Sequence, residues 1–215
     1  MFGARVKIAL EEKGVSYEEK MEDLPNKTQL LLGMNPVHKR VPVLIHNGKP
    51  ICESLIIIEY IDQVWNDRAP FLPNDPYAKA QDPFAKAQAR FWADFVDQKF
   101  YNTHNKIIWN KSKEEVEEGT KELGEILKVL EGALGGNTYF GGDTFGFVDI
   151  ALIGFQVWFH AYETRGKFSI EAEYPKIDAW TKRCLEKETV CKSLGDPNKV
   201  YDLVMSFRKK FELDS

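Results

Sequence analysis

The stretch from Arg40 to Ser54, RVPVLIHNGKPICES, constrains the fold of this chain more than any other part of the sequence. Val43 to Ile45 form a short apolar run, and Asn47-Gly48 follows one residue later. This dipeptide readily adopts positive φ at both central positions of a type I′ turn. The stretch therefore predicts a β-hairpin.

A helix is predicted to begin at Ser54, because the apolar positions of LIIIEYIDQVW continue for three turns after it. Ser54 is placed to cap or open this helix. A helix start directs backbone N–H groups and positive partial charge at what precedes it, which suits a carboxylate, and Glu53 can face an ammonium. These two residues are candidates for binding a small zwitterion; the alternative is a plain N-cap beside a solvated glutamate.

Pro42 adds a second feature to the same stretch. A cis peptide bond before Pro42 would expose the backbone N–H and C=O of Val41 to a ligand, although a trans bond is the commoner form.

The residues up to about 65 have the pattern of a small α/β domain. The expected elements are a helix over Phe2–Lys13, a weak strand over Val15–Lys20, a short helix over Lys27–Leu32, the hairpin, and the helix from Ser54 to about Trp65. The segment NDRAPFLPND then indicates a linker at residues 66–76.

The remainder of the chain, residues 77–215, is predicted to be all-helical. Helical periodicity recurs over Tyr77–Trp109, Lys113–Leu134, Phe147–Ala161, Ile177–Lys187 and Asn198–Phe211. Asp149 follows Gly146 by three positions, from which its carboxylate can reach back to a free N–H group at the helix start, as in a capping box.

A tandem copy precedes this helical part. DPYAKAQ at 75–81 is followed by DPFAKAQ at 82–88, which indicates a local duplication rather than a repeat fold. Pro83 is incompatible with the interior of a helix, so the duplication puts the geometry of any interface formed by this helix in doubt.

Composition excludes several classes of function. A net charge of −4 with mixed signs disfavours nucleic acid, and the three cysteines form neither a disulfide framework nor a CxxC pair. The four histidines share no metal-ligand spacing with them, so no metal is expected. No apolar stretch is long enough to span a membrane and the first residues are not a targeting signal, so a cytosolic protein is expected.

The stretch NPVHKRVPVLIHNGKPICESLIIIEYID resembles the thioredoxin-like domain of a glutathione transferase, close to the plant tau class. The resemblance continues through FGARVKIALEEKG, ARFWADFVD, TYFGGDTFGFVDIAL, AYE and KRCLEKE, and so covers nearly the whole chain. It implies a thioredoxin-like glutathione-binding domain at 1–65 and an all-α domain at 77–215 with a hydrophobic electrophile site. It also implies a cytosolic homodimer that conjugates glutathione to hydrophobic electrophiles in detoxification and stress response. Glutathione is then a co-substrate, and no cofactor is expected.

The resemblance assigns roles residue by residue. Glu53 and Ser54 would bind the γ-glutamyl end of glutathione, the backbone of Val41 would pair with its cysteinyl part, and Lys27 with Arg40 would meet its glycyl carboxylate. Without the resemblance, Lys27 and Arg40 read as solvated surface cations. The electrophile pocket would draw on six residues, namely Phe2, Tyr101, Asn105, Trp109, Trp158 and Phe211, although aromatic residues at helical spacing are also typical of a core.

The thiol-activating group of the family has no counterpart in this sequence. Tau enzymes carry a catalytic serine in an SPFG motif after a first strand, whereas this chain begins Met1-Phe2-Gly3, so serine and strand would precede residue 1. The chain is therefore expected to be shortened at its N-terminus relative to the family and to lose stability with the missing inner strand. Two functions remain open: a glutathione transferase, or a protein that binds glutathione or hydrophobic ligands without conjugating them.

Overall fold

A computed structural model describes residues 1–68, 70–72 and 82–213 of the chain. The first part contains α1 (Phe2–Glu12), α2 (Gln29–Met34), β1 (Val43–His46), β2 (Lys49–Cys52) and α3 (Ser54–Val64). β1 and β2 form an antiparallel pair in the register Val43 to Cys52, and Asn47 and Gly48 between them have φ values of 50° and 74°. The predicted hairpin and the helix after it are confirmed.

The predicted strand over Val15–Lys20 is wrong, because this segment has no regular secondary structure. A strand requires a neighbouring backbone with which to exchange hydrogen bonds. Within the described residues the sheet consists of β1 and β2 alone, so no further strand is available to pair with this segment.

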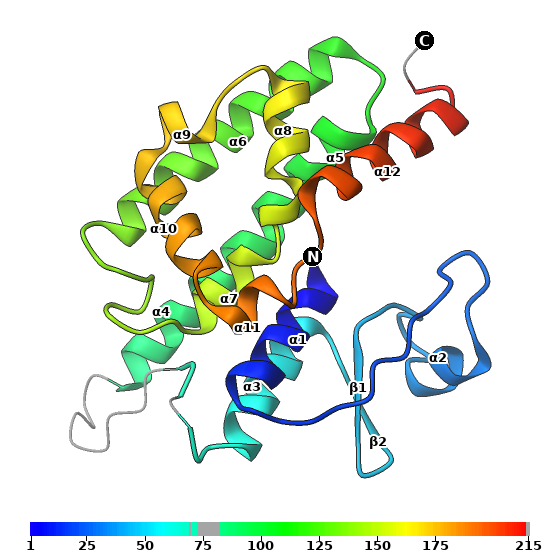
Figure 1. The fold of residues 1–215 in the computed structure, drawn as a ribbon, viewed down its shortest axis with the longest axis vertical. Helices are drawn as coiled ribbons and strands as arrows, with labels where there is room; N and C mark the ends of the chain where they lie inside the picture. The colour runs from blue at the N-terminus through cyan, green and yellow to red at the C-terminus, as the bar shows by residue number, and fades with distance from the viewer. Residues whose placement is uncertain (69, 73–81, 214–215) are drawn as a thin grey trace.

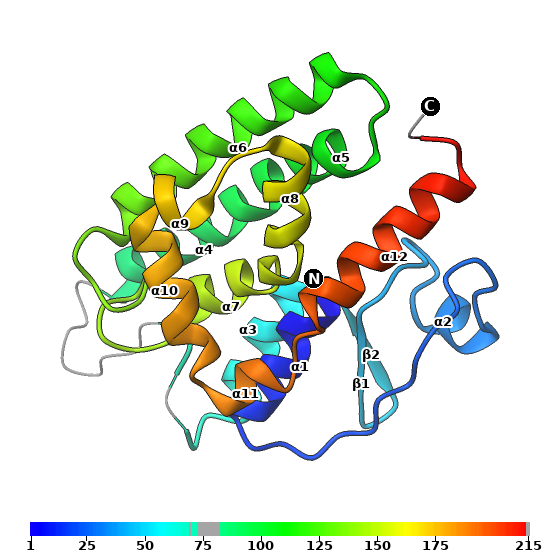
Figure 2. The ribbon, with the colours of Figure 1, turned by 45° about the horizontal axis from the view of Figure 1, so that its top comes forward.

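Helices α1 and α3 lie between the hairpin and the helices of the second part (Figures 1 and 2). Ile8 of α1 and Ile57 and Ile61 of α3 are fully buried in the common core. The apolar faces of both helices are thus covered on the side away from the hairpin, and the start of α3 lies where the hairpin meets the helical part.

The second part contains nine α-helices and two short helices of other types within the described residues. They are α4 (Asp82–Phe95), a π-helix (Val96–Phe100), α5 (Tyr101–Trp109), α6 (Lys113–Leu134), α7 (Phe147–Ile153), a 3-10 helix (Gln156–Trp158), α8 (Phe159–Gly166), α9 (Ile170–Glu173), α10 (Pro175–Leu185), α11 (Glu188–Cys191) and α12 (Pro197–Lys210). The all-helical prediction is confirmed. Two predicted long helices are interrupted, one by the π-helix and one after Ile153.

Gly154, the residue after Ile153, lies against the start of the chain. A Cβ atom at Gly154 would lie 2.9 Å from the carbonyl oxygen of Met1, so only glycine allows the N-terminal end of α1 to approach this closely. Helices α9 and α11 escaped the sequence analysis because each has four residues, too few to show a helical period.

The linker and the tandem copy are described only in part. Residues 69 and 73–76 of the linker and the first copy at 75–81 lie outside the described residues. Asp62 of α3 accepts the backbone N–H groups of Phe71 at 2.9 Å and Leu72 at 3.0 Å, and the carbonyl of Phe71 accepts the N–H of Phe147. The second copy forms the first turns of α4, with Pro83 at its second residue, where a helix tolerates proline.

Asp149 is at the centre of a buried hydrogen-bond cluster in the helical part. Its carboxylate accepts the N–H of Gly146 at 2.9 Å, the N–H of Phe140 at 3.1 Å and the indole N–H of Trp180 at 2.7 Å. The predicted hydrogen bond between the carboxylate of Asp149 and a free N–H group at the helix start is confirmed. Burial raises the pKa of Asp149 from 3.8 to about 6, and the hydrogen bonds oppose that rise.

Among the described residues, no helix is both long enough and apolar enough to cross a bilayer.

Candidate functional site

The start of α3 has the geometry of a binding site for an anionic group. Glu53 is the N-cap residue, and no side chain caps the helix. Its backbone has φ 70° and ψ 119°, a conformation that is strained for a residue other than glycine and that often marks functional sites. The helix therefore begins with backbone N–H groups that are free of a side-chain cap.

The peptide bond between Val41 and Pro42 is cis, as the sequence analysis considered. In the hairpin register Val43 pairs with Cys52, so the next residues on the two strands bring Val41 and Pro42 beside Glu53 and Ser54. Val41 is 42% exposed. Val41 thus lies at the surface, next to the start of α3.

Ser54 opens the helix but does not cap it. Its hydroxyl is buried and accepts a hydrogen bond from Nη1 of Arg5 at 3.0 Å. Arg5, fully buried in α1, also donates from Nε to the carbonyl of Ala151 at 2.8 Å and forms an ion pair with Asp97 at 2.6 Å. The first residue of α3 is thereby fixed to both parts of the molecule.

The remaining predicted glutathione-binding residues lie on exposed segments of the first part. Lys27 precedes α2, and Arg40 follows it, with the carbonyl of Arg40 accepting the side-chain N–H of Asn35 at 2.9 Å. The carboxylate of Glu53 lies 3.8 Å from Nε2 of His38, a residue that the sequence analysis did not select. Besides Arg40, the stretch from 35 to 40 therefore brings His38 beside the carboxylate of Glu53.

Three of the predicted electrophile-pocket residues come together around His104, which the sequence analysis also missed. The ring of Phe2 lies 5.7 Å from that of Tyr101, and His104 packs against Tyr101 at 6.2 Å and against Trp158 at 4.5 Å. His104 follows Tyr101 by three positions on α5. That spacing was the available signal for its place on the same helix face.

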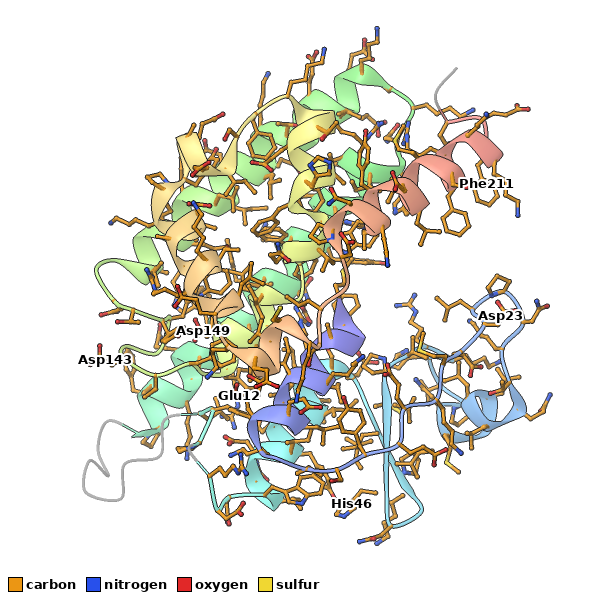
Figure 3. All side chains as sticks on the ribbon, in the orientation of Figure 1. Glu12, Asp23, His46, Asp143, Asp149 and Phe211 are labelled. Carbon is orange, nitrogen blue, oxygen red and sulfur yellow. The ribbon has the colours of Figure 1, made fainter. Side chains whose placement is uncertain are left out.

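The other three predicted pocket residues are not part of this ring cluster. Asn105 is half-buried and donates its side-chain N–H to the carbonyl of Tyr101, and Trp109 lies at the far end of α5. Phe211 lies just beyond the end of α12, is 60% exposed and stacks on Phe207 at 6.4 Å (Figure 3). In Figure 3 it lies on the side of α12 that faces the loop carrying Asp23.

The fold and the site together define a two-domain protein in which a small α/β domain presents a helix start without a side-chain cap beside an aromatic cluster of a helical domain. The model of the glutathione S-transferase N-terminal domain matches residues 1–63, and that of the C-terminal domain matches residues 78–188. A probable glutathione S-transferase, parC, from Nicotiana tabacum is 59% identical over 215 residues, covering 100% of this chain and 94% of the relative. Glutathione S-transferase U25 from Arabidopsis thaliana is 57% identical over 214 residues, covering 100% and 93%.

Solved structures agree with these relatives. Rice GST1 in complex with glutathione superposes with a TM-score of 0.92 at 43% identity, covering 98% of this chain and 92% of that one. A tau-class glutathione S-transferase from mango, Mangifera indica, gives a TM-score of 0.85 at 37% identity, covering 95% and 92%. The chain belongs to the glutathione S-transferase family, in the plant tau class.

Proposed function

We propose that this chain binds glutathione at the start of α3 and conjugates its thiol to hydrophobic electrophiles held at the ring cluster of Phe2, Tyr101 and Trp158. The observation that carries the proposal is the start of α3, which has no side-chain cap and follows a strained Glu53. The N–H groups of the helix start suit the γ-glutamyl carboxylate, and the carboxylate of Glu53 suits the neighbouring ammonium.

The other predicted contacts belong to the same proposal. Val41 would present its backbone to the cysteinyl part of glutathione, and Lys27 and Arg40 would meet the glycyl carboxylate. Glutathione acts as co-substrate without a further cofactor, and the reaction serves detoxification and stress response in the cytosol. Rice GST1 was solved with glutathione, and this supports the choice of ligand.

We further propose that the chain works as a homodimer. Large apolar side chains are exposed on α3 and on α4, among them Ile56 at 59%, Phe84 at 69% and Phe91 at 55%. Exposed apolar side chains gathered on adjoining helices are typical of subunit interfaces. Sedimentation velocity should give twice the chain mass, and Phe91→Glu should shift the population toward monomers; a wild-type monomer would contradict this part of the proposal.

Glu53→Gln is expected to weaken glutathione binding by about tenfold or more, because a charge-assisted hydrogen bond contributes roughly 1.5–3 kcal/mol. Titration calorimetry with the full chain measures the dissociation constant. Glu18→Gln, a change at an exposed glutamate of the same domain, is the matched control and should leave that constant unchanged.

A second ligand locates the contact. Cysteinylglycine lacks the γ-glutamyl group, so Glu53→Gln should hardly change its weaker binding. Equal losses of binding for both ligands would show that Glu53 does not contact the γ-glutamyl group. The conjugation rate of the wild type with a hydrophobic electrophile then separates a transferase from a protein that binds glutathione without reaction.

A further inference from the structure

A groove of about 310 Å³ lies on the helical part, between α8, α9, α10 and the first residue of α12, Pro197. Its apolar lining includes Phe159 and Ile170, which are 7% and 4% exposed, and Leu185, which is half-buried. The volume is at the lower end of the range for small-molecule sites, about 300–1,000 Å³. This cavity is called the α8–α10 groove below.

The α8–α10 groove is separate from the proposed glutathione site. Its lining includes none of the proposed glutathione contacts and none of Phe2, Tyr101 and Trp158. In Figures 1 and 2, α8, α9 and α10 lie away from the hairpin. A ligand in this groove would therefore not compete with glutathione for the same protein atoms.

Carboxylates outnumber cationic groups along the groove. Glu163, Glu171 and Asp178 line it, together with the ammonium of Lys182 and the imidazole of His160. Lys182 pairs with Asp178 at 2.8 Å and with Glu171 at 2.9 Å, so its charge is shared between these two carboxylates. The groove therefore favours a cation over an anion.

Glu163 is the groove carboxylate that no cationic side chain of the described residues pairs with. It is half-buried, and its Oε1 accepts the backbone N–H of Ile170 at 2.8 Å, which fixes the carboxylate at the groove. A carboxylate has lone pairs for several hydrogen bonds, so Glu163 can accept further N–H groups from a ligand. A partly buried negative charge without a counter-charge is best satisfied by a cation.

Thr181 of α10 adds an unpaired hydroxyl to the same groove. It is 7% exposed, and its hydroxyl has no hydrogen-bond partner within the described ranges. A threonine inside a helix can donate to the carbonyl four residues earlier, as Thr103, Thr120 and Thr164 do here. Thr181 does not, and its second helical χ1 rotamer can turn the hydroxyl toward a ligand. Buried polar groups without partners are uncommon in native structures, which points to a ligand.

We propose that the α8–α10 groove is a second ligand site that binds an organic cation with an aromatic body, of the arylalkylamine class. The ammonium group contacts the carboxylate of Glu163 and the hydroxyl of Thr181, and the rings pack on Phe159 and Ile170. An anion would meet three carboxylates, and a neutral ligand would leave Glu163 without a counter-charge. The inference goes beyond the proposed function, because it requires neither glutathione nor a reaction.

The test compares 2-(1-naphthyl)ethylamine with 2-(1-naphthyl)ethanol, which has the same rings and nearly the same size but no charge. Titration calorimetry with the full chain measures both dissociation constants. The amine is expected to bind about tenfold or more tightly than the alcohol, because a charge-assisted hydrogen bond is stronger than a neutral one. The same constants are expected with S-hexylglutathione in excess, since this thioether would occupy the glutathione site and the ring cluster instead.

Glu163→Gln retains an oxygen for the N–H of Ile170 and removes only the charge. It should weaken binding of the amine by about tenfold and leave binding of the alcohol unchanged. Glu117→Gln, at an exposed glutamate of α6, is the matched control and should change neither constant. Thr181→Val removes the unpaired hydroxyl, so it should weaken binding of the amine by about twofold to tenfold without lowering the urea midpoint of unfolding.

Three results would overturn the inference. They are an amine that binds no more tightly than the alcohol, an amine that S-hexylglutathione displaces, and equal binding of the amine to the wild type and Glu163→Gln. A chain that binds the amine through Glu163 but binds neither glutathione nor S-hexylglutathione would overturn the proposed function and support this inference.

Discussion

Replacing Asp149 by alanine is expected to lower the free energy of unfolding by roughly 3 to 5 kcal/mol, because three N–H donors, two buried and one half-buried, lose their acceptor at once. The donors are the backbone N–H groups of Gly146 and Phe140 and the indole of Trp180, which is fully buried. They join the start of α7 to the preceding loop and to α10. Urea unfolding measures the loss.

Asp149→Asn is the matched control. Its amide oxygen can still accept the N–H groups of Phe140 and Trp180, while its NH₂ group opposes the N–H of Gly146. The loss should therefore be clearly smaller than for Asp149→Ala. Equal losses in the two variants would show that the carboxylate does not hold these donors as described.

The same carboxyl group gives stability a defined pH dependence. Its pKa is about 6 in the folded protein against an ordinary value of 3.8, so between these values the folded state binds its proton more tightly than the unfolded chain. The contribution of Asp149 to the free energy of unfolding is thus fully present below pH 3.8 and is lost as the pH rises through 6. The loss is about 3 kcal/mol. The stability of the wild type minus that of Asp149→Asn should fall by most of this amount between pH 4 and 7; a rise would contradict the assignment.

The second large effect is expected at the buried ion pair of Arg5 and Asp97. The Arg5 side chain has no exposed surface, whereas that of Asp97 is 29% exposed. Burial lowers the pKa of Arg5, and the neighbouring carboxylate of Asp97 opposes this shift. Asp97→Leu leaves the guanidinium charge buried without a counter-charge and should lower the free energy of unfolding by about 3–5 kcal/mol.

Arg5→Met should be less damaging, with a loss of about 2 kcal/mol, because the carboxylate left behind can reach water. The combined variant removes both charges, so it should be more stable than Asp97→Leu alone. A double-mutant cycle by chemical unfolding measures all three. If Arg5→Met proves the more destabilising single change, the hydrogen bonds of Arg5 to Ser54 and Ala151 outweigh the ion pair.

Local chemistry in the sequence was sufficient to predict the hairpin and the helix after it. Asn47-Gly48 selects the turn, the apolar run selects the strand, and the periodicity after Ser54 selects the helix, because each depends on neighbours along the chain. The reach of Asp149 to Gly146 was visible for the same reason, since capping spans three residues. Glu53 and Ser54 were also visible locally as candidates for binding a zwitterion, whereas the proposed roles of Lys27 and Arg40 were available only through the family resemblance.

The tertiary structure alone decided where chain segments distant in sequence meet. Contacts with remote residues decided that residues 15–20 form no strand, that Met1 lies against Gly154, and that Arg5 is buried against Asp97 and Ala151. The same holds for His104, whose Nδ1 lies 3.0 Å from the buried hydroxyl of Tyr162, more than fifty positions further on. The sequence determined the elements, because their hydrogen bonds are local; packing between elements decided the site, because a buried side chain takes its partners from the space around it and not from its neighbours in the chain.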